Sequence, residues 1–311
     1  MKPATFASIG ECMIELSGRG DDLWQMGFAG DTFNTAWYAR AVLPKERRVA
    51  YVTALGDDPF SERMRAFIAD AGVETERIRT VAGRRPGLYA ITLDKGERSF
   101  TYWRGESAAR RLVDDSGWLD EALAGADLLY FSGITLGILS PDARRRLLDA
   151  IAAKRRMGAR VAFDPNFRAA LWPDLEEARA AIEASLRVAD FALPTFDDEA
   201  KLFGDASIEA TADRIGALGV GEIVVKNGSE PCLVAAEGRR ERIPTVRPEK
   251  IVDTTGAGDS FGGAYLAARL IGRSPTEAAR LGHRVAAQVV GVHGALAKID
   301  RQEALKSRET G

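Results

Sequence analysis

Short apolar runs alternate with longer amphipathic stretches along most of this chain. Short apolar runs predict buried strands, whereas apolar residues recurring about every three or four positions predict helices with one buried face. Strands are expected at residues 5–9, 48–55, 78–81, 126–132, 160–163, 191–193 and 222–226, with a late hairpin at 232–236 and 241–243. Helices are expected at residues 32–42, 60–71, 141–157, 174–188, 207–219 and 275–292. Strands separated by helices are typical of a mostly parallel sheet with crossover helices, so the pattern predicts an α/β fold.

Residues 84–106 interrupt this alternation. Two short strands, at residues 88–93 and 98–103, are joined by a tight turn at 94–97, which predicts a β-hairpin. We expect this hairpin to belong to a small lid sheet that covers a ligand and that residues 12–16 complete.

Three amphipathic side chains of the hairpin favour a surface that contacts a ligand: Tyr89, Tyr102 and Arg104. Tyr102 and Arg104 are two residues apart and therefore share one face of their strand. The alternative is an ordinary exposed hairpin whose aromatic side chains pack on the body of the protein.

Composition narrows the class of protein. The chain has 311 residues, of which 46% are hydrophobic and 28% charged, so it can bury a sizeable core. Its formal net charge is −2 without a basic block, and no apolar run approaches membrane-spanning length. We therefore expect neither a nucleic-acid nor a membrane partner. Two cysteines, Cys12 and Cys232, make no disulfide framework, which favours a cytoplasmic protein.

A glycine turn precedes a helix that is expected to start about Asp259. Gly256 and Gly258 let the N–H groups of this turn, including that of Ala257, point into one small cavity and bind an anion. A carboxylate beside a bound phosphate suits the removal of a proton from an attacking hydroxyl. We predict that Asp259 is a general base and that the three preceding residues hold the transferred phosphoryl group. The alternative is that Asp259 merely caps its helix.

Residues 253–261, Asp-Thr-Thr-Gly-Ala-Gly-Asp-Ser-Phe, resemble the C-terminal signature of the ribokinase-like sugar kinases, the phosphofructokinase-B superfamily. Further matches to this family run through nearly the whole chain. The resemblance implies one ribokinase-like domain over residues 1–311, with three α/β/α layers, a mostly parallel central sheet and a small β-sheet lid from segments at about 12–30 and 84–106. It also implies ATP-dependent phosphorylation of a sugar hydroxyl, with Mg2+.

The segment 27–34 leads into the first predicted helix and places Asp31 and Asn34 one turn apart on one face. These short polar side chains suit hydrogen bonds to sugar hydroxyls, and Gly30 permits close approach of a ligand. In the resembled family the matching segment contacts the sugar, although Ala29 stands where the commoner pattern has the first of two glycines. The alternative is that Asp31 caps the helix and Asn34 is solvated.

Asp164, Asn166 and Arg168 follow a predicted strand, at the edge where parallel sheets bind ligands. Asp164 can order a metal-bound water or a phosphate, and we place Asn166 with it on the nucleotide side. Arg168 is a fork-shaped donor suited to a carboxylate or phosphate. The alternative is a salt bridge between Asp164 and Arg168 that shapes the loop.

The resembled family carries an asparagine and, three residues later, a glutamate that helps to place magnesium. Here Phe196 stands three residues before Glu199. If Thr195 is the asparagine equivalent, the acid is Asp198 instead. Helix capping by Asp197 or Asp198 is the alternative, and we assign no direct protein ligand to the metal, with Glu199 acting through water.

Three residues resemble the family's nucleotide-contacting loop: Lys226, Asn227 and Gly228. His283 resembles the position that borders the adenine, although a lone helical histidine is commonly packed or solvated. Asp253 and Thr255 match residues that hold a monovalent cation in some relatives.

Two arginines, Arg104 and Arg168, are expected to converge with the hairpin tyrosines on the substrate. A neutral sugar leaves a buried guanidinium unpaired, at a cost on the order of several kcal/mol, whereas a sugar acid offers it a carboxylate. Four segments closely resemble the 2-keto-3-deoxygluconate kinases, which use ATP to make 2-keto-3-deoxy-6-phosphogluconate: residues 10–16, 85–89, 100–104 and 132–134. The resemblance therefore implies a small sugar acid and ATP as the substrates.

Two other functions stay open at this point. The chain could phosphorylate a neutral sugar such as fructose or ribose, with the arginines bound to phosphate or to neighbouring acids. It could also be a non-catalytic sugar or nucleotide sensor. The presence of Asp259 directly after the glycine turn argues against that role, because a sensor has no use for a carboxylate that faces a phosphate. A homo-oligomer is expected, because an open lid sheet has an edge that another subunit can cover.

Overall fold

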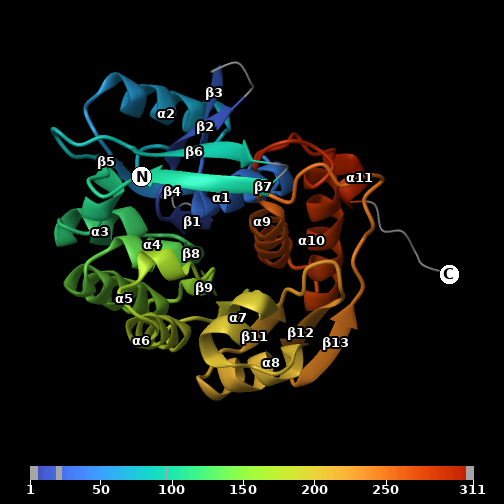
Figure 1. Cartoon of the computed structure of the whole chain (residues 1–311). Helices are drawn as coiled ribbons and strands as arrows, with labels where there is room; N and C mark the ends of the chain where they lie inside the picture. Colours follow the sequence, from blue (N-terminus) through green and yellow to red (C-terminus); the bar gives the residue numbers. More distant parts are fainter. Residues whose placement is uncertain (1–5, 19–22, 95–96, 306–311) are drawn as a thin grey trace.

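The computed structural model describes residues 6–18, 23–94 and 97–305, whose elements form three layers around a central sheet (Figure 1). This sheet has nine strands, in the spatial order β5 (Ile78–Thr80), β4 (Val49–Leu55), β1 (Phe6–Ile9), β8 (Leu128–Ser132), β9 (Arg160–Asp164), β10 (Phe191–Ala192), β11 (Glu222–Val225), β12 (Cys232–Ala236) and β13 (Arg239–Ile243). The strands from β5 to β11 are parallel, and β12 and β13 add an antiparallel hairpin at one edge. The predicted α/β class with a mostly parallel sheet is confirmed.

Helices cover both faces of the sheet (Figure 1). One core receives side chains from α1 (Asp31–Val42), α2 (Pro59–Asp70), α9 (Ala257–Leu270), α10 (Pro275–Val289) and α11 (Arg301–Leu305). The opposite core receives side chains from α3 (Ser116–Leu123), α4 (Gly133–Ile138), α5 (Pro141–Arg156), α6 (Leu175–Leu186), α7 (Phe196–Phe203) and α8 (Ile208–Ala217). Two 3-10 turns, Ala108–Arg111 and Ala169–Leu171, lie between these elements. None of the helices within the described ranges is long and apolar enough to cross a membrane.

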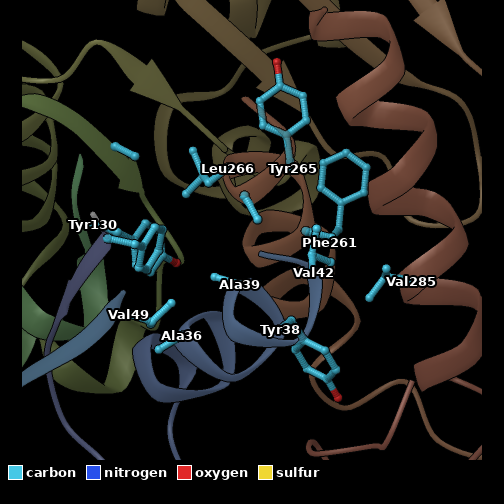
Figure 2. Close-up of a cluster of buried hydrophobic side chains, with 14 of the residues drawn as sticks. Ala36, Tyr38, Ala39, Val42, Val49, Tyr130, Phe261, Tyr265, Leu266 and Val285 are labelled. Atoms are coloured by element: carbon cyan, nitrogen blue, oxygen red, sulfur yellow. The ribbon is translucent and has the colours of Figure 1, made fainter. Parts of the chain in front are cut away.

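Successive side chains of a β-strand point to opposite faces of the sheet, so each strand can contribute side chains to both hydrophobic cores. On β8, Leu128 and Tyr130 belong to the core under α1 and α9, whereas Leu129 and Phe131 belong to the opposite core. All four are buried, as expected for a strand covered on both faces. Figure 2 shows the first of these cores, in which Tyr130 lies toward the sheet and side chains of α1 and α9 close over it.

A second sheet forms the lid. Its four strands lie in the order β3 (Trp24–Ala29), β2 (Met13–Gly18), β6 (Gly87–Asp94) and β7 (Glu97–Trp103). The predicted hairpin is β6–β7, and β2 pairs with β6 in parallel, which confirms that residues 12–16 complete the lid. Residues 95–96 of the predicted turn lie outside the described residues, as do residues 19–22.

Some short elements escape the sequence pattern. Strand β3 was not predicted, since Gly27 interrupts its apolar residues, yet this glycine pairs with Glu15 of β2. Helices α3, α4 and α7 were also missed, because six or eight residues are too few for an apolar repeat to stand out in the sequence. These elements are recognised only once their neighbours in space are known.

Helices α1 and α9 approach each other unusually closely. A Cβ atom on Gly263 of α9 would lie 2.4 Å from the carbonyl oxygen of Thr35 and 3.1 Å from the amide nitrogen of Ala39, both on α1. The absence of a side chain at this position therefore lets the two backbones touch, and the first turns of the two helices also meet, where Thr35 Oγ1 lies 3.5 Å from the carbonyl oxygen of Asp259.

The substitution Gly263→Ala should lower the free energy of unfolding by about 1–3 kcal/mol, because a Cβ at this point overpacks the helix contact. The neighbouring Gly262→Ala is the matched control, since its Cβ would lie 3.6 Å from Leu193, an ordinary contact. This control should be neutral or gain up to about 1 kcal/mol from helix propensity. Urea unfolding of both variants tests the contact, and equal losses would contradict it.

Candidate active site

The glycine turn before α9 is built largely as the sequence predicts. The helix begins at Ala257, two residues earlier than expected, and its N-cap is Gly256 in the left-handed conformation (φ 76°). Asp259 occupies the third helical position, so capping is not its role. The N–H of Ala257 donates to the carbonyl oxygen of Thr254 at 3.2 Å, so this amide is already engaged within the turn.

The side chain of Asp259 faces helix α1. Its Oδ2 accepts a hydrogen bond from Asn34 Nδ2 at 2.8 Å, and its carbonyl oxygen accepts one from Thr35 Oγ1 at 3.5 Å. Asn34 is only 4% exposed, and its Oδ1 accepts a hydrogen bond from the N–H of Gly30 at 3.3 Å. The alternative of a solvated Asn34 is therefore wrong.

Asp31, the first residue of α1, is also held from another element. Its Oδ2 accepts a hydrogen bond from Asn166 Nδ2 at 2.9 Å, and the N-cap of α1 is Gly30, so Asp31 does not cap the helix. Asn166 has φ 33°, which is uncommon for a residue with a side chain, and its N–H donates to Asp164 Oδ1 at 3.2 Å. Asn166 therefore links the residues expected at the sugar to those expected at the nucleotide.

Asp164 pairs with Lys226 and not with Arg168. Lys226 Nζ donates to Asp164 Oδ2 at 2.5 Å, and a Cβ on Gly258 would lie 3.4 Å from the same Nζ. The ammonium group thus lies beside the glycine turn. Arg168 instead pairs with Asp198 at 3.2 Å, so the proposed Asp164–Arg168 salt bridge is wrong.

Two carboxyl groups near this turn, those of Asp259 and Asp164, have raised pKa values. Burial, followed by the charge of Asp31, raises the pKa of Asp259 to about 7, while the hydrogen bond from Asn34 and the charge of Lys226 oppose the rise. Burial also raises the pKa of Asp164, against the opposing effect of Lys226. A carboxyl group with a pKa near neutrality is well suited to accept a proton and release it again.

Arg104 has an acidic partner that the sequence analysis missed. Its Nη2 donates to Oε2 of Glu11, a buried residue between β1 and the first lid strand. Room for this pair comes from Gly87, where a Cβ would lie 2.8 Å from Glu11 Oε1. The signal was an acid directly after a buried parallel strand, at the edge where such sheets bind ligands.

Contrary to the expectation from the sequence, a neutral sugar would therefore not leave these guanidinium groups unpaired, and the pairs agree with the alternative in which the arginines bind neighbouring acids. Arg104 has Glu11 and Arg168 has Asp198. The pair at Glu11 is incompletely satisfied, however, because Arg104 Nε and Glu11 Oε1 are buried without a hydrogen-bond partner in the described chain. Since a guanidinium has five N–H donors, Arg104 retains donors for a ligand.

The two hairpin tyrosines lie together on the lid. Tyr89 and Tyr102 face each other across β6 and β7, with ring centroids 5.8 Å apart, and the Arg104 guanidinium lies 5.8 Å from the Tyr102 ring. Tyr89 is buried and its hydroxyl donates to Glu15, whereas Tyr102 is 51% exposed. Tyr102 thus does not pack on the body, and it shares a face with Arg104 as predicted.

A cavity of about 590 Å3 lies between the lid sheet and the loops near α9. Polar lining residues come from both sides: Glu15, Ser17 and Gln25 from the lid, and Asp253 and Thr255 from the loop before the glycine turn. Its volume falls in the range of small-molecule sites. Asp253 ties two loops together, because its carboxylate accepts the N–H groups of Thr255 at 2.9 Å and Gly294 at 2.8 Å. A monovalent cation at Asp253 and Thr255 stays a prediction.

The three acids at the start of α7 have different environments. Glu199 is completely buried and pairs with Arg214 at 2.6 Å, and burial raises its pKa to about 7. Asp197 is exposed. Asp198 is partly buried beside Arg168, and its pKa is raised by burial. The described residues contain no group of three or more His, Cys, Asp or Glu that could hold a metal ion directly.

Three further candidates belong to the turn after Lys226 and to helix α10. Asn227 and Gly228 form the turn that follows Lys226, with Gly228 at φ 57°. His283 is buried, with its Nε2 3.3 Å from the sulfur of Cys232, and burial lowers its pKa to about 4. The histidine is thus packed, as the alternative had it, and a position bordering the adenine stays a prediction.

Comparison with known proteins connects this geometry to a family. The model of the pfkB family of carbohydrate kinases matches residues 4–302. The chain is 43% identical to a 2-dehydro-3-deoxygluconokinase of Dickeya dadantii over 98% of this chain and 100% of the relative, and 45% identical to that of Escherichia coli K12 over 93% and 96%. A provisionally assigned ribokinase II of E. coli, solved with ATP and Mg2+, is 22% identical with a TM-score of 0.83, over 94% of both chains.

The raised pKa of Asp259 should make stability depend on pH. Since the pKa in the folded protein, about 7, exceeds the ordinary value of 3.8, stability should fall as pH rises between these values. Asp259→Asn removes the cost of ionising this carboxyl group in the folded protein. The free energy of unfolding of the variant, relative to the wild type, should therefore be higher at pH 8 than at pH 5 by at least about 1 kcal/mol. Urea unfolding at both pH values measures it. Asp197→Asn is the exposed control, and an equal gain for Asp259→Asn at both pH values would contradict a raised pKa.

Proposed function

The chain belongs to the pfkB family of carbohydrate kinases, and on that premise we propose that it phosphorylates 2-keto-3-deoxy-D-gluconate with ATP. The terminal phosphoryl group of ATP passes to the primary hydroxyl, giving 2-keto-3-deoxy-6-phosphogluconate and ADP. The observation that carries the proposal is the sequence identity with 2-dehydro-3-deoxygluconokinases over nearly the full length of the chain. It is supported by Asp259, which follows the glycine turn and does not cap its helix. This is 2-dehydro-3-deoxygluconokinase activity.

Asp259 acts as the general base of this reaction. Its Oδ2 is held by Asn34, and its Oδ1 accepts the proton of the primary hydroxyl as that oxygen attacks the phosphorus atom. The N–H groups of Gly256 and Gly258 and the ammonium of Lys226 stabilise the charge on the transferred phosphoryl oxygens. Ala257 contributes less, since its N–H is bound to Thr254.

The sugar lies between the start of α1 and the lid. Asp31 and Asn34 bind hydroxyls, with Gly30 permitting the approach, and Arg104 binds the substrate carboxylate with its remaining donors. Arg168 supplies a second guanidinium from the body. Tyr89 and Tyr102 cover the sugar from the lid sheet.

ATP lies along the loop at Lys226 and the start of α9, with Asp164 and Asn166 beside it. Mg2+ would be held mainly through phosphates and water. Asp198, partly buried beside Arg168, fits the placement of a metal-bound water better than the fully buried Glu199. When bound, the ion neutralises phosphate charge.

The proposed function also implies how the chain is divided into a kinase domain and a lid. We infer one ribokinase-like domain over residues 1–311, from which lid segments at about 12–30 and 84–106 extend. Closure of the lid excludes water and limits hydrolysis of ATP. We expect a cytoplasmic homo-oligomer, which size-exclusion chromatography with light scattering can test.

The activity is tested by ADP release coupled to a reporter enzyme, with 2-keto-3-deoxygluconate, fructose and ribose as acceptors. Turnover with the sugar acid and little with the neutral sugars is expected. A preference for a neutral sugar would support the alternative kinase, and absence of turnover with all three would support a sensor.

Asp259→Asn should reduce kcat by at least about 100-fold, the usual contribution of a general base, and leave sugar binding largely intact. Coupled ADP release measures the first effect and titration calorimetry with 2-keto-3-deoxygluconate the second. Near-normal turnover in this variant would refute the assignment of the base.

Arg104→Ala should weaken binding of the sugar acid by roughly 10- to 100-fold, the value of a charged hydrogen bond, and affect a neutral analogue much less. Arg84→Ala is the matched control, because Arg84 pairs with Glu106 near the base of the same hairpin. Equal losses for both kinds of sugar would show that Arg104 does not bind the carboxylate.

A further inference from the structure

We propose that Asn34 is a positioning residue that orients the carboxylate of Asp259 for proton transfer, beyond any contact it makes with the sugar. The inference rests on the proposed kinase function. It is carried by the geometry that joins the first turns of α1 and α9.

The side-chain amide of Asn34 can take only one orientation. The N–H of Gly30 is a donor, so the atom that faces it at 3.3 Å must be the carbonyl oxygen Oδ1. The NH2 group must then face Asp259, where Nδ2 lies 2.8 Å from Oδ2. Asn34 is thus a fixed donor to the proposed base.

The surroundings prevent this amide from turning away. Asn34 is 4% exposed, and a Cβ on Gly30 would lie 2.1 Å from the carbonyl oxygen of Glu11, so the backbone that holds Oδ1 is itself packed tightly. On the other side, Thr35 Oγ1 contacts the carbonyl oxygen of Asp259, and Gly263 lets the two helices touch. The distance between Asn34 and Asp259 is therefore set by helix packing.

The hydrogen bond does two things to the base. It occupies Oδ2, which directs the remaining oxygen, Oδ1, toward the sugar hydroxyl. It also stabilises the charged form of Asp259, against burial and neighbouring negative charge. The titratable groups that surround Asp259 come from four elements: Asp31 and Tyr38 of α1, Tyr130 of β8, Asp164 of β9, and Lys226 after β11.

A positioning role and a sugar-binding role predict different kinetics. If Asn34 only binds a hydroxyl, its loss should raise KM for the sugar and leave the pH dependence of kcat unchanged. If Asn34 holds Asp259, its loss should lower kcat and move the acidic limb of the kcat profile to higher pH, because the base is then protonated more readily.

The sharpest variant is Asn34→Asp, which has the same shape and still accepts the N–H of Gly30 but cannot donate to Asp259 when ionised. We expect kcat at pH 7 to fall at least about tenfold, the acidic limb to rise by about one pH unit or more, and part of the activity to return at pH 9. Asn34→Leu removes the donor without adding a charge and should move the limb in the same direction. Gln302→Glu, the same change of amide to acid at an exposed position of α11, is the control and should behave as the wild type.

Two readouts keep this inference separate from the proposed function. The titration of Asp259 is followed without turnover, by infrared difference spectroscopy of the carboxylate bands with Asp259→Asn as the blank, and its pKa should rise in both Asn34 variants. An unmoved pKa and acidic limb, with only KM changed, would overturn the positioning role. An inactive wild type whose Asp259 pKa still depends on Asn34 would overturn the kinase function instead.

Discussion

The close contact of helices α1 and α9 is the constraint on which the rest of the site depends. Gly263 lets the two backbones meet, and the first turn of each helix then presents one polar side chain to the other, Asn34 and Asp259. Each helix also has a glycine as its N-cap, Gly30 or Gly256, which lets the backbone pack closely there: a Cβ on Gly30 would lie 2.1 Å from the carbonyl oxygen of Glu11, and one on Gly256 would lie 2.8 Å from that of Ala295. The proposed general base, sugar-binding surface and anion site are thus brought together by one packing contact.

The same arrangement has an energetic cost. Besides burial, the charges of Asp31 and Asp164 raise the pKa of Asp259, the charge of Asp31 also raises the pKa of Asp164, and Lys226, which opposes both shifts, pairs with Asp164. Two asparagine amides compensate in part, since Asn34 donates to Asp259 and Asn166 donates to Asp31. A protein that keeps mutually repelling acids in one partly buried place gives up stability, as is common at catalytic sites.

The lid changes how recognition of a sugar acid should be understood. The arginine at its base is already neutralised by Glu11, and the arginine of the body by Asp198. If Arg104 binds the substrate carboxylate as proposed, that carboxylate does not neutralise a lone buried charge but joins an incompletely satisfied pair, in which Arg104 Nε still lacks a partner within the described chain. On this proposal, selectivity depends on the geometry of the donors that Glu11 holds in place and less on net charge.

Local features were determined by the sequence itself. The alternation of strands and helices, the hairpin of the lid and the glycine turn ahead of Asp259 each depend on residues close together in the chain, where spacing fixes geometry. The short elements β3 and α7 were not predicted, because six or eight residues are too few for a period to be distinguished from chance in the sequence.

Only the tertiary structure decided which polar groups meet. Asn34 and Asp259 are 225 residues apart, Glu11 and Arg104 93, and Asp164 and Lys226 62. Each of these acids has several nearby cations or amides in the sequence, and spacing does not rank them. Packing of helices and strands selects the partner, because a hydrogen bond needs its atoms within about 3 Å, a distance that no local pattern specifies.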